Sequence, residues 1–288
     1  MSLSIRRVVS EGISVATSRS GAVLALLFFV AESLGVLLML VAGTTYVPVD
    51  IGTGVTGGPE VAAGGELPAS VAAVTSALTG VFTAIVTIPI TIVAIRTFVG
   101  GATDGIPDAY LFDRIGRATA SAFGASLLYG LVVVTISFVS AFVLLAAAVL
   151  VGGTDVATSA VGLLAFATLA FVIVVGTIAL FGIVWLHTLF LLHEVSVRDR
   201  GALGAFRGSW AAVRGNRLKL AALAGGLVVI RGLVSWVSVP SGYGGWSTLQ
   251  LLLTPIGLAV TAVVGVYVTA ILARAYRRLR PDVGETFT

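Results

Sequence analysis

Long apolar stretches dominate this sequence and restrict what it can fold into. Six of them reach about 20 residues or more, the length that a helix needs to cross the hydrocarbon core of a bilayer. They cover residues 21–43, 70–95, 118–151, 158–192, 218–239 and 248–275. Only 10% of the 288 residues are charged, against about 25% in an ordinary soluble domain. A soluble fold could not bury this much apolar surface, so the sequence predicts an integral membrane protein.

The apolar stretches are continuous rather than alternating, which predicts helices and not the strands of a membrane barrel. We therefore expect an all-α fold of six transmembrane helices, forming a single domain over residues 1–288. The third and fourth stretches exceed what a core of about 30 Å requires, so these helices should tilt, kink or project beyond it. The extracytoplasmic loop 44–68 is rich in Gly and Pro, which argues against regular structure there.

Arginine and lysine are unevenly distributed among the segments between these stretches. They occur before the first stretch and after the second, fourth and sixth, whereas the other three connections contain none. By the positive-inside rule, both termini are predicted to be cytoplasmic. A basic cytoplasmic face indicates contact with anionic lipid headgroups rather than with nucleic acid. We expect a multi-pass protein of the cell membrane whose partners include membrane lipids.

A weak internal repeat divides the chain into three similar units. In each, a short segment with arginines precedes two apolar stretches, and the units begin near residues 4, 108 and 197. This predicts three helix pairs in the same orientation, with short amphipathic cytoplasmic helices before spans 1, 3 and 5. Inverted-repeat transporters instead relate their halves through the membrane plane.

The segment of about residues 199–217 predicts a helix that lies in the cytoplasmic interface. Its apolar residues recur at helical spacing and share a face: Leu203, Phe206, Trp210 and Val213. Arg207 and Arg214 flank that face, where they can reach lipid phosphates. The opposite face is rich in Gly and Ala, which suits close packing against another helix.

The same segment also carries a family resemblance. The run from Ala205 to Trp210, AFRGSW, with Asn216-Arg217 before an apolar stretch, is similar to the "A-x-x-x-S-W … N/G-R" element of a six-span superfamily. That superfamily includes the membrane domain attached to some glycerophosphodiester phosphodiesterases, and prokaryotic and archaeal membrane proteins of unknown function. In those enzymes the chemistry belongs to a soluble barrel domain, for which this sequence has no room. The resemblance therefore implies a membrane scaffold rather than hydrolase activity.

Two charges lie inside apolar stretches, Glu32 in the first and Arg231 in the fifth. Ionisable residues at membrane depth are costly and are candidates for function. Counted from the cytoplasmic ends of their helices, both lie about 16–20 Å deep, so they could pair. One hypothesis is a structural ion pair that fixes helix docking. A second is a substrate, ion or proton site, and a third is an Arg231 side chain that extends to the outer interface.

No motif in the sequence predicts an active site. Cysteine is absent, which excludes thiolate catalysis and thiolate metal sites. His187 and His193 lie six residues apart and point to different helix faces, unlike a zinc-binding i, i+4 pair. We therefore predict a non-enzymatic protein without a cofactor or metal, acting as a membrane scaffold or envelope-associated component. The alternative is a small-molecule or lipid permease or carrier that uses the Glu32–Arg231 region.

Overall fold

A computed structural model describes residues 3–46, 69–152, 159–238 and 248–283, and all regular structure in these ranges is helical. In chain order the helices are α1 (Ile5–Ala16), α2 (Arg19–Tyr46), α3 (Ala69–Gly100), α4 (Asp108–Phe112), α5 (Ile115–Gly152), α6 (Ala160–Thr188), α7 (Leu191–Arg198), α8 (Ala202–Val213), α9 (Arg217–Ser238) and α10 (Thr248–Leu279). Most of the predicted loop, residues 47–68, lies outside the described residues.

The six predicted stretches correspond closely to long helices. Within the described residues, five segments are long and apolar enough to cross a membrane: 19–38, 80–100, 115–150, 160–198 and 253–279. The fifth predicted span is α9, which is not among these five segments and carries Arg217, Lys219 and Arg231. Six spans and their orientation therefore remain predictions. The predicted 158–192 stretch is divided, because α6 ends at Thr188 and α7 begins at Leu191.

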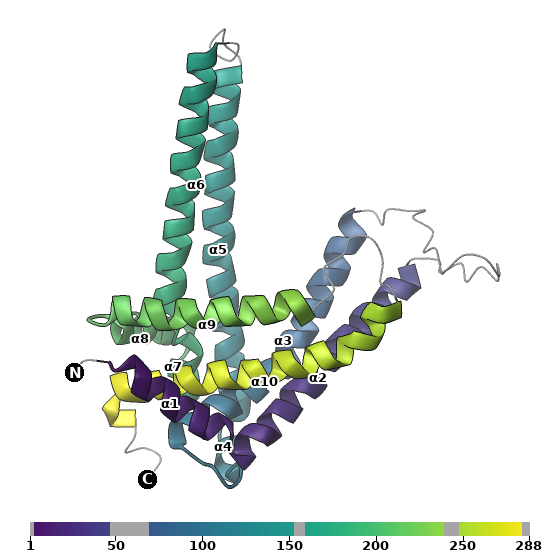
Figure 1. The fold of residues 1–288 in the computed structure, drawn as a ribbon, viewed down its shortest axis with the longest axis vertical. Helices are drawn as coiled ribbons and strands as arrows, with labels where there is room; N and C mark the ends of the chain where they lie inside the picture. The colour runs from purple at the N-terminus through teal and green to yellow at the C-terminus, as the bar shows by residue number, and fades with distance from the viewer. Residues whose placement is uncertain (1–2, 47–68, 153–158, 239–247, 284–288) are drawn as a thin grey trace, which may run out of the picture.

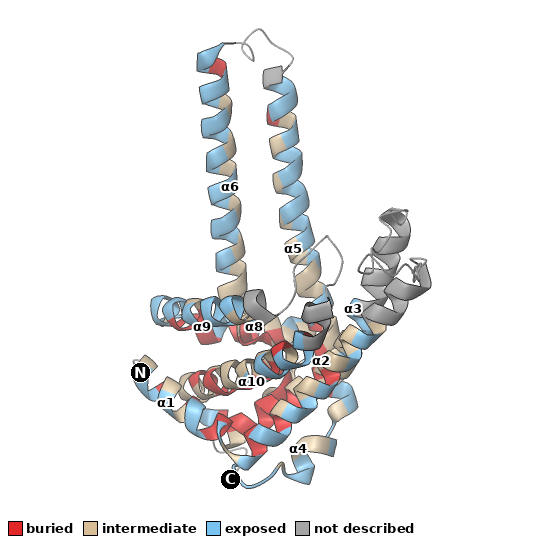
Figure 2. Ribbon diagram, turned by 45° about the vertical axis from the view of Figure 1, so that its right-hand side comes forward, coloured by how far each residue is buried: buried red, intermediate tan, exposed pale blue. Residues whose placement is uncertain are grey.

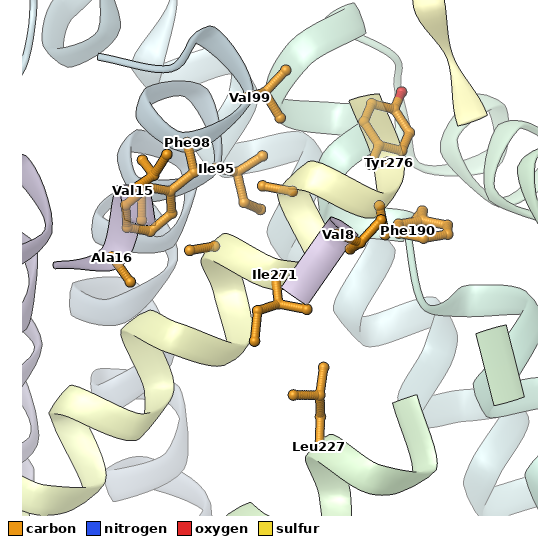
Figure 3. Close-up of a cluster of buried hydrophobic side chains, with 14 of the residues drawn as sticks. Val8, Val15, Ala16, Ile95, Phe98, Val99, Phe190, Leu227, Ile271 and Tyr276 are labelled. Atoms are coloured by element: carbon orange, nitrogen blue, oxygen red, sulfur yellow. The ribbon is translucent and has the colours of Figure 1, made fainter. Parts of the chain in front are cut away.

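The hydrophobic core lies at one end of the molecule, where α1, α2, α3 and α10 pack together (Figure 1). Figure 3 shows how side chains distant in sequence meet there, among them Val8, Phe98, Phe190 and Tyr276, all with no exposed surface. A second cluster joins the start of α5 to α3, α7 and α8 through small side chains such as Ala118 and Ala205. We call this end of the molecule, formed by α1, α4, α7, α8 and the adjoining ends of α2, α3, α5 and α10, the base.

The upper parts of α5 and α6 form a hairpin that projects from the base (Figures 1 and 2). Its apolar side chains are exposed almost throughout; Phe138 and Phe171, for example, are 71% and 68% exposed. A polar contact joins the two helices, with the Thr177 and Ser140 hydroxyl oxygens 2.9 Å apart. This surface is compatible only with an apolar environment, either lipid or other membrane helices.

Short helices precede α2, α5 and α9, as the repeat predicts. They are α1, the five-residue α4, and α8. α1 is strongly amphipathic and turns its apolar residues onto α10. α9 lies alongside α10 and crosses the foot of the hairpin (Figure 1).

Candidate functional site

A fully buried carboxylate, that of Glu194 in α7, lies where α7, α8 and α10 meet. Its Oε2 lies 3.1 Å from Nη1 of Arg200, and its Oε1 lies 3.5 Å from Nη2 of Arg280. Two guanidinium groups from distant parts of the sequence thus neutralise one buried anion. A buried charge without such partners would cost several kcal/mol, roughly the effective desolvation penalty per ion.

α8 approaches this carboxylate so closely that only glycine fits at position 208. A Cβ added to Gly208 would overlap the carboxylate of Glu194 and lie 2.5 Å from Nη1 of Arg200. Arg280 also donates from Nη2 to the Gly208 carbonyl oxygen, at 3.1 Å. The backbone of α8 is therefore part of the same charged group, which we call the Glu194 cluster (Glu194, Arg200, Arg280 and Gly208).

The next residue, Ser209, closes the break between α6 and α7. Its hydroxyl donates to the His187 carbonyl oxygen at 2.6 Å and accepts from the Phe190 backbone N–H at 3.1 Å. One side chain thus satisfies two of the backbone groups that the helix ends leave open. Trp210 follows and stacks on the His187 ring, with a centroid distance of 3.9 Å. These contacts explain physically why the AFRGSW segment has Gly, Ser and Trp in succession.

The turn from α7 into α8 brings Arg200 back over Glu194. Asp199 adopts a left-handed backbone conformation there, with φ of 50°, which Asp tolerates better than most residues. Its carboxylate Oδ2 lies 3.1 Å from Nη1 of Arg114 and 3.3 Å from Nη1 of Arg117, both at the start of α5. The turn is therefore held in place by the foot of the hairpin.

Other charged residues of the base also tie helices together. Arg96 is 7% exposed and donates to backbone carbonyl oxygens, from Nε to Ser196 at 2.9 Å and from Nη1 to Asp113 at 2.7 Å. Arg278 in α10 donates to Glu11 in α1 from two of its three guanidinium nitrogens, from Nε to Oε2 at 3.2 Å and from Nη2 to Oε1. The hydrogen bond from Arg278 lowers the pKa of Glu11 below its ordinary value.

The structure places Glu32 and Arg231 in the same region but not in contact. The charge of Arg231 acts on the half-buried Glu32 carboxylate, yet no ion pair within 4.0 Å joins them among the described residues. Glu32 Oε2 is buried without a hydrogen-bond partner in the described part of the chain. Glu32 and Arg231 are thus close to one another without forming an ion pair. Whether they act in helix docking or in binding stays a prediction.

Arg231 lies instead on the wall of a cavity of about 410 Å³ between α3, α5, α6, α7, α9 and α10. His193 lines the same cavity; its side chain is buried, with the ring centroid 5.3 Å from that of Tyr276. Neither of its ring nitrogens has a hydrogen-bond partner within the described ranges. Unpaired buried polar groups are rare and costly, which makes this cavity the second candidate site.

The predicted interfacial helix α8 has an exposed outer face and a buried inner face. Leu203 is 67% and Trp210 39% exposed, and Phe206, Arg207, Trp210 and Arg214 line a pocket of about 330 Å³ on the outer face. Gly208 and Ala212 face inward, as expected. Val213, which we assigned to the exposed stripe, is fully buried, because the helix ends there and the residue packs into the core.

Sequence reasoning missed the Glu194 cluster. In the sequence Glu194 stands beside His193 at the end of an apolar stretch, where an acid is unremarkable. Its partners come from a turn and from the residue that follows α10, and no local spacing joins Glu194 to Arg280. The glycine at 208, next to the Ser-Trp pair, was the available signal, because a close helix contact needs a partner surface.

The whole chain was then compared with known proteins. Residues 3–279 match the family described as a domain of unknown function, DUF7847. The chain belongs to the DUF7847 family. No curated protein and no solved structure matches it. For this DUF7847 member the match includes the cavity with Arg231 and the Glu194 cluster except Arg280. Within its described residues, no group of three or more His, Asp or Glu side chains could hold a metal ion.

Proposed function

We propose that this protein is a non-enzymatic membrane scaffold, in which a charge-locked base holds the apolar α5–α6 hairpin. The proposal is based on the partners of the buried charged residues, which are other parts of the same chain. Glu194 binds two arginines and Arg96 binds backbone carbonyls. The Ser209 hydroxyl, next to Gly208 in the sequence, is committed to two backbone groups. The charges thus support architecture rather than catalysis.

The hairpin supplies the surface that a scaffold needs. Its side chains are exposed within the chain, and Gly130, Gly176 and Gly182 have open space where a Cβ would lie. Small residues on apolar helices allow close contact with other membrane helices. The base fixes the foot of the hairpin through Arg114, Arg117 and Asp199. A partner membrane protein could therefore bind a rigid, positioned surface.

Photo-crosslinking in native membranes tests this role. A photoreactive residue replacing Phe138 or Phe171 should give protein adducts of defined, reproducible mass. A matched probe replacing Phe28, which packs against the core, should give only crosslinks within the chain. Adducts from the hairpin positions that consist solely of lipid would contradict the scaffold proposal.

We further infer six spans with both termini cytoplasmic, α9 being the fifth. The arginine distribution and the 22-residue length of α9 support this topology. The chain has no cysteine, so single cysteines can be introduced as labels. An impermeant maleimide applied to intact cells should modify Ser159→Cys, at the outer end of α6, but not Gly105→Cys, between α3 and α4. Labelling of Gly105→Cys but not of Ser159→Cys would show that the protein has the opposite orientation.

A second candidate function, a carrier for small molecules or lipids, is favoured by the cavity beside Arg231. Helix-lined cavities of this size, within the range of roughly 300–1,000 Å³, are typical ligand sites. Reconstituted vesicles would show whether a ligand crosses the bilayer at a rate that Arg231→Gln abolishes. Wild-type flux no greater than in protein-free vesicles would leave no support for a carrier.

A further inference from the structure

The cavity bounded by six helices combines polar and apolar walls. Its polar or aromatic residues are Thr91, Ser126, Tyr129, Trp185, Thr188, His193, Arg231 and Thr269. Its apolar residues are Ile95, Leu189, Leu191, Leu192, Val268 and Leu272. Of the residues that line the cavity, Arg231 carries a charge. Glu32 is not part of this lining. An occupant must therefore match a cation on one side and aliphatic side chains on the other.

The hydrogen-bond donors that face the cavity can be counted. Its three threonines each donate to a backbone carbonyl of their own helix, Thr91 to Thr87 at 2.8 Å, Thr188 to Val184 at 2.9 Å and Thr269 to Gly265 at 2.8 Å. Each hydroxyl carries one proton, so the threonines have no donor left for a ligand.

Four other residues keep their donors available. The structure gives no hydrogen bond to the Ser126 and Tyr129 hydroxyls, the Trp185 indole N–H or the Arg231 guanidinium within the described residues. His193 adds a ring N–H that is buried and unpartnered. These available donors lie around one cation, an arrangement that can hold an anion. A guanidinium can bind a phosphate or carboxylate through two parallel hydrogen bonds.

We propose that this cavity binds the anionic head of an amphiphile, a phosphate or carboxylate group held by Arg231, with its acyl chain along the apolar wall. Tyr129 and Ser126 are placed to donate to the same group. Binding of this kind requires no transport, so it stands whether the protein is a scaffold or a carrier. It also gives a role to the arginine that lies within the apolar stretch of α9.

The neighbouring Glu32 makes the proposal testable, because its substitution should change the affinity in the opposite direction to substitution of Arg231. The carboxyl group of Glu32 lies near Arg231, and in its ionised form it repels a second anion there. Glu32→Gln should therefore raise the affinity for an anionic amphiphile, while Arg231→Gln should lower it. A purely structural ion pair would make both substitutions harmful in the same way.

Trp185 on the cavity wall allows binding to be read directly. The purified protein is placed in phosphatidylcholine nanodiscs and titrated with a phosphatidylglycerol that carries brominated acyl chains, which quench nearby indoles. We expect a saturable component of the quenching that is lost in Trp185→Phe. Arg231→Gln should weaken binding by about tenfold or more, as loss of a charge-assisted contact predicts. Tyr129→Phe should weaken it less, and Glu32→Gln should strengthen it. Thr135→Val, in the α5–α6 hairpin and outside the cavity, is the control and should change nothing.

A competition arm identifies the source of the anion. If inorganic phosphate displaces the brominated lipid at similar concentration, the site binds free phosphate and the acyl-chain part of the proposal is wrong. If only amphiphiles compete, the lipid headgroup assignment stands. Arg231→Lys, which keeps the charge, guards against misfolding of the Gln variant. Equal quenching by brominated phosphatidylcholine, or binding unchanged in both Arg231→Gln and Tyr129→Phe, would overturn the proposal.

Discussion

The base and the α5–α6 hairpin are both built from helices, but they are held together by opposite means. In the base, charged residues lie between helices and join them, as Glu194 does with Arg200 and Arg280. In the hairpin, α5 and α6 carry almost exclusively apolar side chains, exposed along most of their length (Figure 2). The base holds its shape through contacts within the chain, whereas the hairpin depends on whatever surrounds it.

This difference follows from what drives helix association in each setting. Between apolar helices in lipid, burial of further apolar surface gains little, because lipid is as apolar as a side chain. Specific ion pairs and hydrogen bonds therefore determine which helices stay together. Substitutions in the base should thus affect stability in detergent far more than substitutions in the hairpin.

The largest effect is expected for Glu194→Gln. It leaves two guanidinium groups beside one another without the buried anion. Removing one partner of a buried pair costs about 3–5 kcal/mol, and the partial exposure of both arginines reduces this to about 2–4 kcal/mol. Thermal unfolding in detergent measures the loss. Phe171→Ala in the hairpin is the comparison and should stay within about 0.5 kcal/mol; equal losses in the two variants would erase the contrast.

Gly208→Ala should come next, because its Cβ would overlap the Glu194 cluster. Overpacking at such a contact costs about 1–3 kcal/mol. Gly204→Ala, in the same helix, is the control, since the nearest atom to its Cβ is 3.6 Å away. That variant should be neutral, or up to about 1 kcal/mol more stable through helix propensity. Similar behaviour of the two variants would show that α8 does not pack as described.

A smaller effect is expected at the polar contact within the hairpin. Thr177→Val removes the contact with Ser140 while keeping the shape of the side chain. Interhelical hydrogen bonds between membrane helices are worth about 0.6 kcal/mol on average. Unfolding in bilayer discs should show a loss near that size. A loss as large as that of Glu194→Gln would mean that the hairpin, too, is held by polar contacts.

The smallest effect concerns pH and the partly exposed pair Glu11–Arg278. The pKa of Glu11 is lowered in the folded protein, so its contribution is present above the ordinary value of 4.5 and is lost as pH falls through the folded value. Because solvent screens a partly exposed pair, this amounts to about a few tenths of a kcal/mol. Melting curves between pH 7 and about pH 3 should fall slightly more for wild type than for Glu11→Gln. Identical pH profiles would show that the pair is not formed.

The long helices could be predicted because their signal is local and repeated. Continuous apolar runs fixed the six helical segments to within a few residues, and the arginines marked one end of each pair. The division at Leu189–Phe190 could not be predicted, because it depends on Ser209 supplying both a donor and an acceptor. Nothing near residue 190 in the sequence signals this break.

The candidate site was less predictable for the same reason. Glu32 and Arg231 were recognised because a charge in an apolar run is conspicuous, and depth alone brought them to the same region. Depth does not determine which side chains touch, and Arg231 faces the cavity rather than forming an ion pair with Glu32. Glu194 was overlooked because its burial results from α8 and α10 folding over it, which local hydropathy does not reveal.

The docking of α1 on α10 has a consequence for synthesis. Gly12 lies directly against Ile271, and Glu11 and Arg278, which bind one another, are separated by 267 residues. Because the helices are synthesised in chain order, the apolar face of α1 stays uncovered until almost all of the chain has been made. The base can close only after α10 is inserted, so loss of α10 should leave the earliest helix exposed to quality-control proteases.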